Sequence, residues 1–350
     1  MSTPWPLAAK VAGRMAGTYP LAETYHGKEL AATMPGITIR AAELVHVETG
    51  LDGTGAPDVL VTSRAEWAER NLSSFAHLLA PLEARIEERL KQEDRNNSAS
   101  AELARKVVAV EAGALLGALS RRVLGQYELV LPTGDSGDAV AFVGANILAL
   151  ERRHQFRPSD FRMWIALHES THRAQFAGVP WLRSYFLSLV EELVASAKPD
   201  PGKLMRVVDE VASARRERRP IFDENGVIGL FAGAEQKAVL DRVQALMSLL
   251  EGHGHVVMDR IGARLYKSQA RMSAVLSARR RDPKTAALLR IAGLEMKMRQ
   301  YEQGARFVKG VEQAAGWDQL ALAWKDPQSL PDLAEIEQPE KWLERVGSAA

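Results

Sequence analysis

The chain has 350 residues, of which 46% are hydrophobic and 25% are charged, and its formal net charge is +1. This length and composition are typical of a globular protein with one large or two fused domains, and the near-zero charge argues against a protein that coats nucleic acid with its whole surface. The absence of cysteine excludes disulfides, thiolate zinc sites and a cysteine nucleophile, so any metal must be held by histidine and carboxylate side chains.

The first residues of the sequence, Met1 to Pro6, contain neither a basic segment nor an apolar one, so we do not expect a signal peptide. No stretch approaches 18 uncharged apolar residues, and therefore no transmembrane helix and no membrane partner are expected. Together with the lack of cysteine, these features favour a cytoplasmic location.

Helical periodicity dominates the first part of the chain. The apolar spacing predicts helices at 63–94, with a possible kink at Pro81, and at 101–124. Two β-prone runs follow at 127–132 and 139–143, separated by a cluster of turn residues. They predict a β-hairpin or two short paired strands, and they are the only convincing β signal in the chain.

A well-delimited helix is predicted next, at 161–176. Ser159 or Asp160 can cap its start, and Gly178 followed by Pro180 ends it. Further helices are expected at 181–197, 201–217, 234–265 and 284–311, with a loop at 222–233. The tail, which carries three tryptophans, is expected to wrap over the body.

The chemistry-bearing motif lies in the helix at 161–176, where His168-Glu-Ser-Thr-His172 matches the pattern HExxH. Residues four apart lie on one helical face, so both imidazoles can bind one ion. Glu169 is rotated about 100° from His168 and can reach a water on that ion. Zinc lowers the pKa of such a water to about 7, and Glu169 would take its proton. A surface helix with two solvated histidines is the alternative, and Arg173 departs from the stricter zincin pattern, which prefers an uncharged residue there.

A catalytic zinc ion needs a third protein ligand and an open fourth position. Glu251, His255 and Asp259 fall on one face of the helix at 234–265. Gly252 and Gly254 weaken the middle of that helix. We rank Glu251 first as the third ligand, then His255, then His253. Asp259 could hold a ligand imidazole in the right tautomer. A polar face turned to solvent is the alternative.

Two weaker features concern the C-terminal third. Tyr301 could stabilise an oxyanion near the metal, but packing is the simpler role. Residues 260–310 hold 13 lysines or arginines against 3 acidic residues. Without aromatic interleaving or a nucleic-acid motif, this segment favours a solvated basic helix face over a docking face, and no nucleic-acid partner is expected.

Several stretches along the chain, together with the HExxH motif, are distinctive in combination. They are 64–71 with 74–75, 123–127, 143–146, 178–183, 251–253 with 258–259, 293–301, and 330–331 with 339–342. In these stretches the sequence resembles a family of zincin-like metallopeptidases found mainly in actinobacteria and their relatives. Its members are described as uncharacterised hydrolases, and one branch is labelled as associated with deazaflavin-cofactor biosynthesis.

The resemblance implies a mainly α fold, with a zincin-like helical domain and a small β-hairpin or sheet next to the HExxH helix. It implies zinc as the cofactor, with His168 and His172 as ligands and Glu169 as general base. It also implies Glu251 as the third ligand and Asp259 as a residue that holds the ligands in place. Many members are expected to have an acidic residue where this chain has His255, which leaves open whether that ring touches the metal.

We therefore expect a zinc-dependent hydrolase, in the first place a metallopeptidase, with a peptide or a small molecule as substrate. Residues 1–125 would form an N-terminal helical region and residues 126–350 the metal-binding region with its C-terminal wrap, within one compact unit. By similarity to zincins, the strand at 139–143 would be the rim along which a peptide pairs. The alternatives are a metal-binding helical scaffold or small-molecule hydrolase without protease activity, and a basic helical interaction module in which HExxH is accidental.

Overall fold

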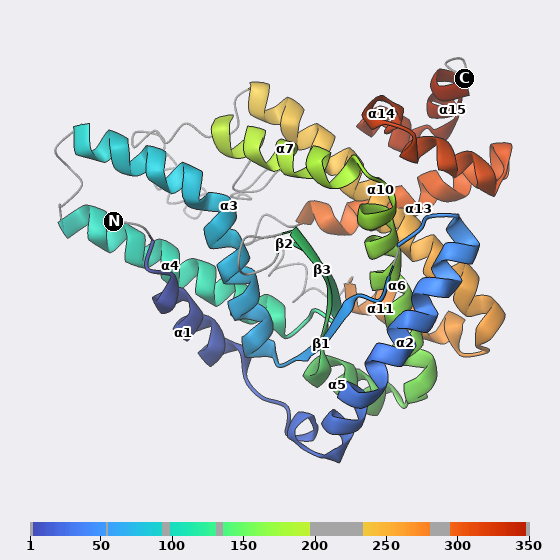
Figure 1. Ribbon diagram of the computed structural model, residues 1–350, viewed down its shortest axis with the longest axis horizontal. Coiled ribbons are helices and arrows are strands. Elements are labelled where there is room, and N and C mark those ends of the chain that lie inside the picture. The colour runs from blue at the N-terminus through green and yellow to red at the C-terminus, as the bar shows by residue number, and fades with distance from the viewer. Residues whose placement is uncertain are drawn as a thin grey trace, which may run out of the picture. The chain divides into compact units, whose positions relative to one another are not determined.

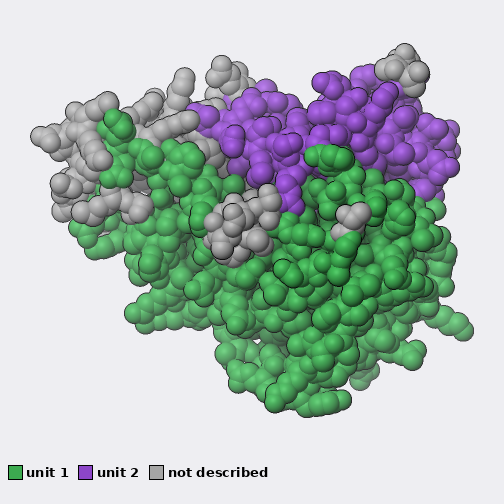
Figure 2. Space-filling model, in the orientation of Figure 1, with its two compact units in different colours: residues 1–180, 257–272 green, residues 181–256, 273–350 purple. Residues whose placement is uncertain are grey.

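The structure is a computed structural model that describes residues 3–53, 55–92, 99–130, 136–196, 234–280 and 295–347 (Figure 1). Within these residues the fold is mainly α with one small sheet, which confirms the predicted fold class. The chain divides into two compact units (Figure 2): residues 1–180 with 257–272, and residues 181–256 with 273–350. The division into regions 1–125 and 126–350 stays a prediction.

The first unit contains several helices besides the motif helix. These are α1 (Trp5–Ala16), η1 (Pro20–Glu23), α2 (Tyr25–Thr49), α3 (Arg64–Gln92), α4 (Ala99–Ser120) and α5 (Gly144–His154). Helices α3 and α4 confirm the two predicted helices of this region, and Pro81 lies inside α3 without ending it. A core of small alanines from α1 and of larger side chains such as Trp67 and Leu72 holds α1, α3 and α4 together.

The sheet has the order β1-β3-β2, where β1 is Asp58–Thr62, β2 is Gly125–Val130 and β3 is Ser136–Val143. Strands β2 and β3 are antiparallel and confirm the predicted hairpin. Strand β1 pairs with β3 in parallel and was not predicted. Its four consecutive apolar or β-branched residues form too short a run for periodicity to reveal.

One expectation about the sheet is wrong. Residues 139–143 were expected to form the rim along which a peptide pairs, but they belong to β3, the central strand. Both edges of β3 are already hydrogen-bonded to neighbouring strands, β1 and β2, so no backbone groups remain for a peptide. A peptide that extends this sheet must pair with an outer strand.

The predicted motif helix is α6 (Pro158–Gly178). It ends at Gly178 as expected, but its start differs from the prediction. The helix begins at Pro158 after an N-cap at Arg157, which makes no side-chain cap. Proline suits this first position because its missing N–H would have no helical partner there. Asp160 lies in the first turn instead and accepts hydrogen bonds from Ser159 and Ser268.

The remaining elements lie mainly in the second unit. They are α7 (Leu182–Ser196), α10 (Ala234–Leu265), α11 (Gln269–Arg280), α13 (Glu295–Ala315), η2 (Trp317–Trp324), η3 (Pro327–Ser329), α14 (Leu333–Glu337) and α15 (Pro339–Gly347). Helices α7 and α10 match the predicted ones at 181–197 and 234–265. The predicted helix 201–217, the loop 222–233 and the start of the helix 284–311 lie outside the described residues.

The tail of the chain packs on α13 as short helical turns, around a core that contains Phe307 and Trp342. Helices α10 and α13 also approach each other closely in this unit. A Cβ atom on Gly252 would lie 2.1 Å from the carbonyl carbon of Gly304, and one on Gly304 would lie 1.8 Å from the carbonyl oxygen of Ser248. Glycine in the middle of α10, which weakens a helix by itself, therefore allows the two backbones to touch.

Among the described residues, no helix is both long and apolar enough to cross a membrane.

Candidate metal centre

Helix α6 is buried along nearly its whole length, but its two halves differ in character. The first half buries apolar side chains such as Phe161, which is at 0% exposure, and also the charged side chains of Asp160 and Arg162, which have partners of their own. The second half carries the HExxH motif and buries polar side chains among them, including Glu169 and Arg173. Because burying unsatisfied polar groups is costly, such a helix half indicates a site with specific partners.

The two histidines of the motif point toward one another. The Nε2 atoms of His168 and His172 are 3.2 Å apart, and both rings are half-buried. Two imidazole nitrogens that bind one tetrahedral zinc ion at 2.0–2.1 Å would lie roughly 3.3 Å apart. The spacing in this helix therefore fits a shared zinc ion without rearrangement.

The orientation of the second ring is fixed by a residue that the sequence did not single out. Nδ1 of His172 lies 2.9 Å from Oε1 of Gln175, whose side chain is fully buried. When Nδ1 carries the proton and donates it to this amide oxygen, Nε2 keeps its lone pair for a metal. Gln175 is three residues after His172 on the same helix face, and only that spacing could have indicated it.

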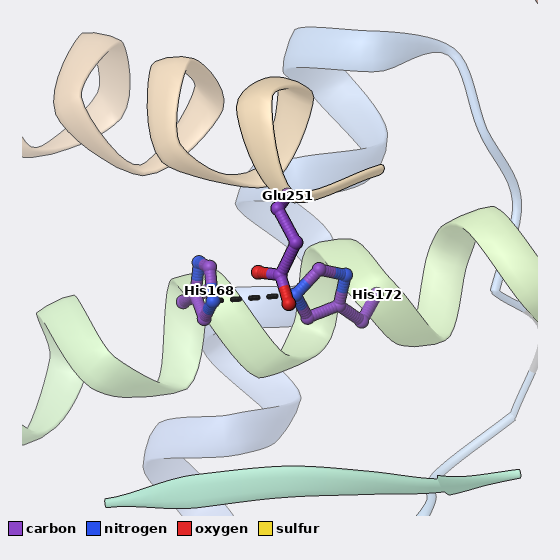
Figure 3. Close-up of side chains that lie close together, drawn as sticks. All are labelled: His168, His172 and Glu251. Atoms are coloured by element: carbon purple, nitrogen blue, oxygen red, sulfur yellow. Dashed lines mark hydrogen bonds between the residues drawn. The ribbon is translucent and has the colours of Figure 1, made fainter. Parts of the chain in front are cut away.

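The third member of the group is Glu251 of α10, which is 4% exposed. One carboxylate oxygen of Glu251 and one nitrogen from each of His168 and His172 lie within 4.8 Å of one another. Figure 3 shows the carboxylate directed toward the two rings. Two imidazoles and one carboxylate form a donor set that suits zinc in a catalytic site, and these side chains fit the ion that the motif predicts.

Glu169, the predicted general base, is 6% exposed and lies against the start of β2. A Cβ atom placed on Gly125 would be 2.6 Å from Cγ and 2.7 Å from Oε1 of Glu169. Real Cβ atoms do not approach their neighbours so closely, so a side chain at residue 125 would force the carboxylate of Glu169 to move. Gly125 therefore shapes the site, and the sequence indicated it only as part of the stretch 123–127.

Arg173, which departs from the stricter zincin pattern, has a structural explanation. Its guanidinium donates two hydrogen bonds of 2.7 Å to the carboxylate of Asp138 on β3 and one of 2.8 Å to the carbonyl oxygen of Gly53. The side chain is 1% exposed. Arg173 thus ties the motif helix to the central strand of the sheet and to the loop before β1, and its charge is neutralised by a planar two-bond pair.

The other predicted site residues differ in their surroundings, and their roles at the site stay predictions. His253 packs between Trp317, with ring centroids 5.8 Å apart, and Trp324, at 5.2 Å. Asp259 accepts a hydrogen bond of 2.6 Å from Gln269. His255 is half-buried on α10 and, like these two, is not among the grouped metal donors of the described residues. The side chain of Tyr301 lies outside the described residues.

Two comparisons with known proteins found a match. The profile of the zincin-like metallopeptidase family matches residues 4–343. A crystal structure from Chloroflexus aurantiacus, described as "a putative hydrolase with a novel fold", has 30% sequence identity to this chain and a TM-score of 0.73, and the match covers 98% of each chain. The comparison with curated proteins found no match. On the strength of a family match along nearly its full length, the chain belongs to the zincin-like metallopeptidases.

Proposed function

We propose that this protein is a zinc-dependent peptidase in which His168, His172 and Glu251 hold the ion and Glu169 is the general base. The observation that carries the proposal is the Nε2 to Nε2 distance of 3.2 Å in a group that also contains a buried carboxylate. Membership of the family and the likeness to a structure described as a putative hydrolase support it.

The residues of the chain divide the work between them. Zinc, when bound, would act as a Lewis acid on the scissile carbonyl and lower the pKa of a water molecule. Glu169, which follows the first ligand on α6, would accept the proton of that water and deliver it to the departing amine. Gly125 leaves room for this carboxylate, and Gln175 keeps the lone pair of His172 available.

The proposal is tested by measuring zinc content and peptide cleavage in the same preparations. Wild type, Glu169→Gln and His168→Ala would be compared by metal analysis and with a library of quenched fluorescent peptides. We expect Glu169→Gln to keep about one zinc per chain and to lose cleavage by roughly a hundredfold or more. His168→Ala should lose both. Glu111→Gln, on the exposed face of α4, is the matched control and should change neither.

Each alternative has its own outcome in this experiment. Stoichiometric zinc with no cleavage of any peptide, but with Glu169-dependent hydrolysis of small amides or esters, would indicate a small-molecule hydrolase. Zinc without any hydrolysis would indicate a metal-binding scaffold. Unchanged cleavage in Glu169→Gln would refute the assigned base, and the absence of zinc would leave HExxH accidental. The cytoplasmic location and the absence of nucleic-acid and membrane partners stay predictions.

A further inference from the structure

The first unit contains a groove of about 610 Å³ that is separate from the HExxH residues. It is lined by residues 59–62 of β1, by Ala31 of α2, and by Glu66, Glu69, Arg70 and Ser73 of α3. The volume lies within the range of about 300–1,000 Å³ that is common for ligand sites. The motif residues do not line it, so the proposed hydrolysis does not account for it.

Strand β1, which lines this groove, has backbone N–H and C=O groups on the side away from β3. Within the described part of the chain, β1 pairs with β3 alone and forms the end of the sheet. Alternate residues of such a strand direct both their N–H and C=O groups away from the neighbouring strand. Val59, Leu60 and Val61 are half-buried and add apolar contacts. A strand of five residues spans roughly 16 Å, which suits an extended segment of similar length.

The charges around the groove favour a cationic ligand. Glu69 is exposed on α3, and Glu66 accepts a hydrogen bond from the backbone N–H of Ser63. Arg70 is the cation among the lining residues, but Glu128 binds it with two hydrogen bonds of 2.8 and 2.5 Å. These hydrogen bonds also raise the pKa of Arg70. Glu66 also acts on the charge of Arg70, so Glu69 is the glutamate whose charge is most available to a basic ligand.

We propose that this groove binds an extended, basic segment of a partner protein, which adds to the sheet as a strand beside β1. Backbone hydrogen bonds to β1 would provide affinity, and lysine or arginine side chains next to Glu66 and Glu69 would provide selectivity. A second copy of this chain is a poor occupant. Pairing through β1 in both copies would bring the two α3 helices, with their glutamates, toward one another, and like charges repel.

The test measures binding of a labelled heptapeptide of alternating valine and lysine by fluorescence anisotropy. Glu169→Gln protein is used throughout, so that binding is read without cleavage and the result is independent of the proposed hydrolysis. We expect saturable binding with one peptide per chain. Glu69→Lys should weaken it about tenfold, since a favourable surface charge pair becomes a repulsive one. Glu111→Lys, an equal charge change on an exposed helix face, should leave it within about twofold.

A second peptide separates strand addition from simple charge attraction. Methylation of alternate backbone nitrogens keeps every lysine but removes the hydrogen-bond donors, and in the register that faces β1 it should abolish binding. Equal binding of the methylated peptides, equal effects of Glu69→Lys and Glu111→Lys, or no binding below 1 mM, roughly the weak limit for a specific contact, would each overturn the proposal. So would a dimer in sedimentation that Glu69→Lys dissociates, because the occupant would then be a second copy.

Discussion

The histidines of α6 and those of α10 look alike in sequence but meet different surroundings. On α6, His168 and His172 are four residues apart, their Nε2 atoms face one another at 3.2 Å, and Gln175 orients the second ring. On α10, His253 packs almost parallel to Trp317, with an interplanar angle of 12°, and edge-on to Trp324. One pair directs nitrogen atoms toward a common point, and the other ring presents its faces to aromatic neighbours.

The difference shows what spacing alone determines. Residue spacing places two side chains on one face of a helix, but the elements packed against that face decide whether the rings meet polar or aromatic groups. Glu251 and His253 are two residues apart on α10 and therefore point in different directions. The carboxylate lies with the candidate metal donors, while the ring packs against the two tryptophans.

The strongest test of this difference is to measure zinc affinity after changing one histidine on each helix. His172→Ala should lower the affinity by on the order of a thousandfold, because one of three protein ligands is lost. His253→Phe keeps an aromatic ring between the tryptophans and should leave the affinity within about twofold. Competition against a chromophoric chelator measures both. A comparable loss of zinc in His253→Phe would show that the two environments do not differ in function.

Gly125→Val tests whether the close approach of β2 positions the base. The added side chain would collide with Glu169, and misplacement by about 1 Å can cost roughly a hundredfold in rate. We expect that loss in peptide cleavage, with zinc content unchanged. Gly36→Val is the matched control, since nothing lies within 4 Å of a Cβ atom there. Full activity of folded Gly125→Val protein would refute the role of this glycine.

Arg173→Ala tests, through protein stability, whether the buried ion pair anchors the motif helix. It removes a buried guanidinium from Asp138 and from the carbonyl oxygen of Gly53, and should lower the free energy of unfolding by about 2–4 kcal/mol. Urea denaturation provides the measurement. Arg40→Ala breaks the surface pair with Glu43, in which both side chains are more than half exposed, and should cost less than about 0.5 kcal/mol. Equal losses in the two variants would show that Arg173 anchors nothing.

Gln175→Leu is expected to have the smallest effect. The substitution keeps the approximate size of the side chain but removes the acceptor for Nδ1 of His172, and zinc affinity should fall about tenfold. The lost affinity should return in Gln175→Glu, which again offers an oxygen to Nδ1. If Gln175→Leu binds zinc as tightly as wild type, the tautomer of His172 is set by another group.

Much of the fold and part of the site could be predicted from local patterns. The apolar periodicity located α3, α6 and α10, and the HExxH spacing located the two histidines. Strand β1 could not be predicted in this way, because its short apolar run becomes a strand only through pairing with β3. The roles of Gly125 and Asp138 could not be predicted for the same reason, since each acts through a contact with α6 that depends on the packing of distant segments.

The crossing of α10 and α13 at Gly252 and Gly304 has a consequence for how this protein can vary. Because the two backbones touch there, a methyl group added at Gly304 of α13 would collide with the backbone of α10 and displace that helix. Glu251, which directly precedes Gly252, would move with its helix. A change at residue 304 would therefore shift a candidate metal ligand, although residue 304 is not itself in the group of candidate donors.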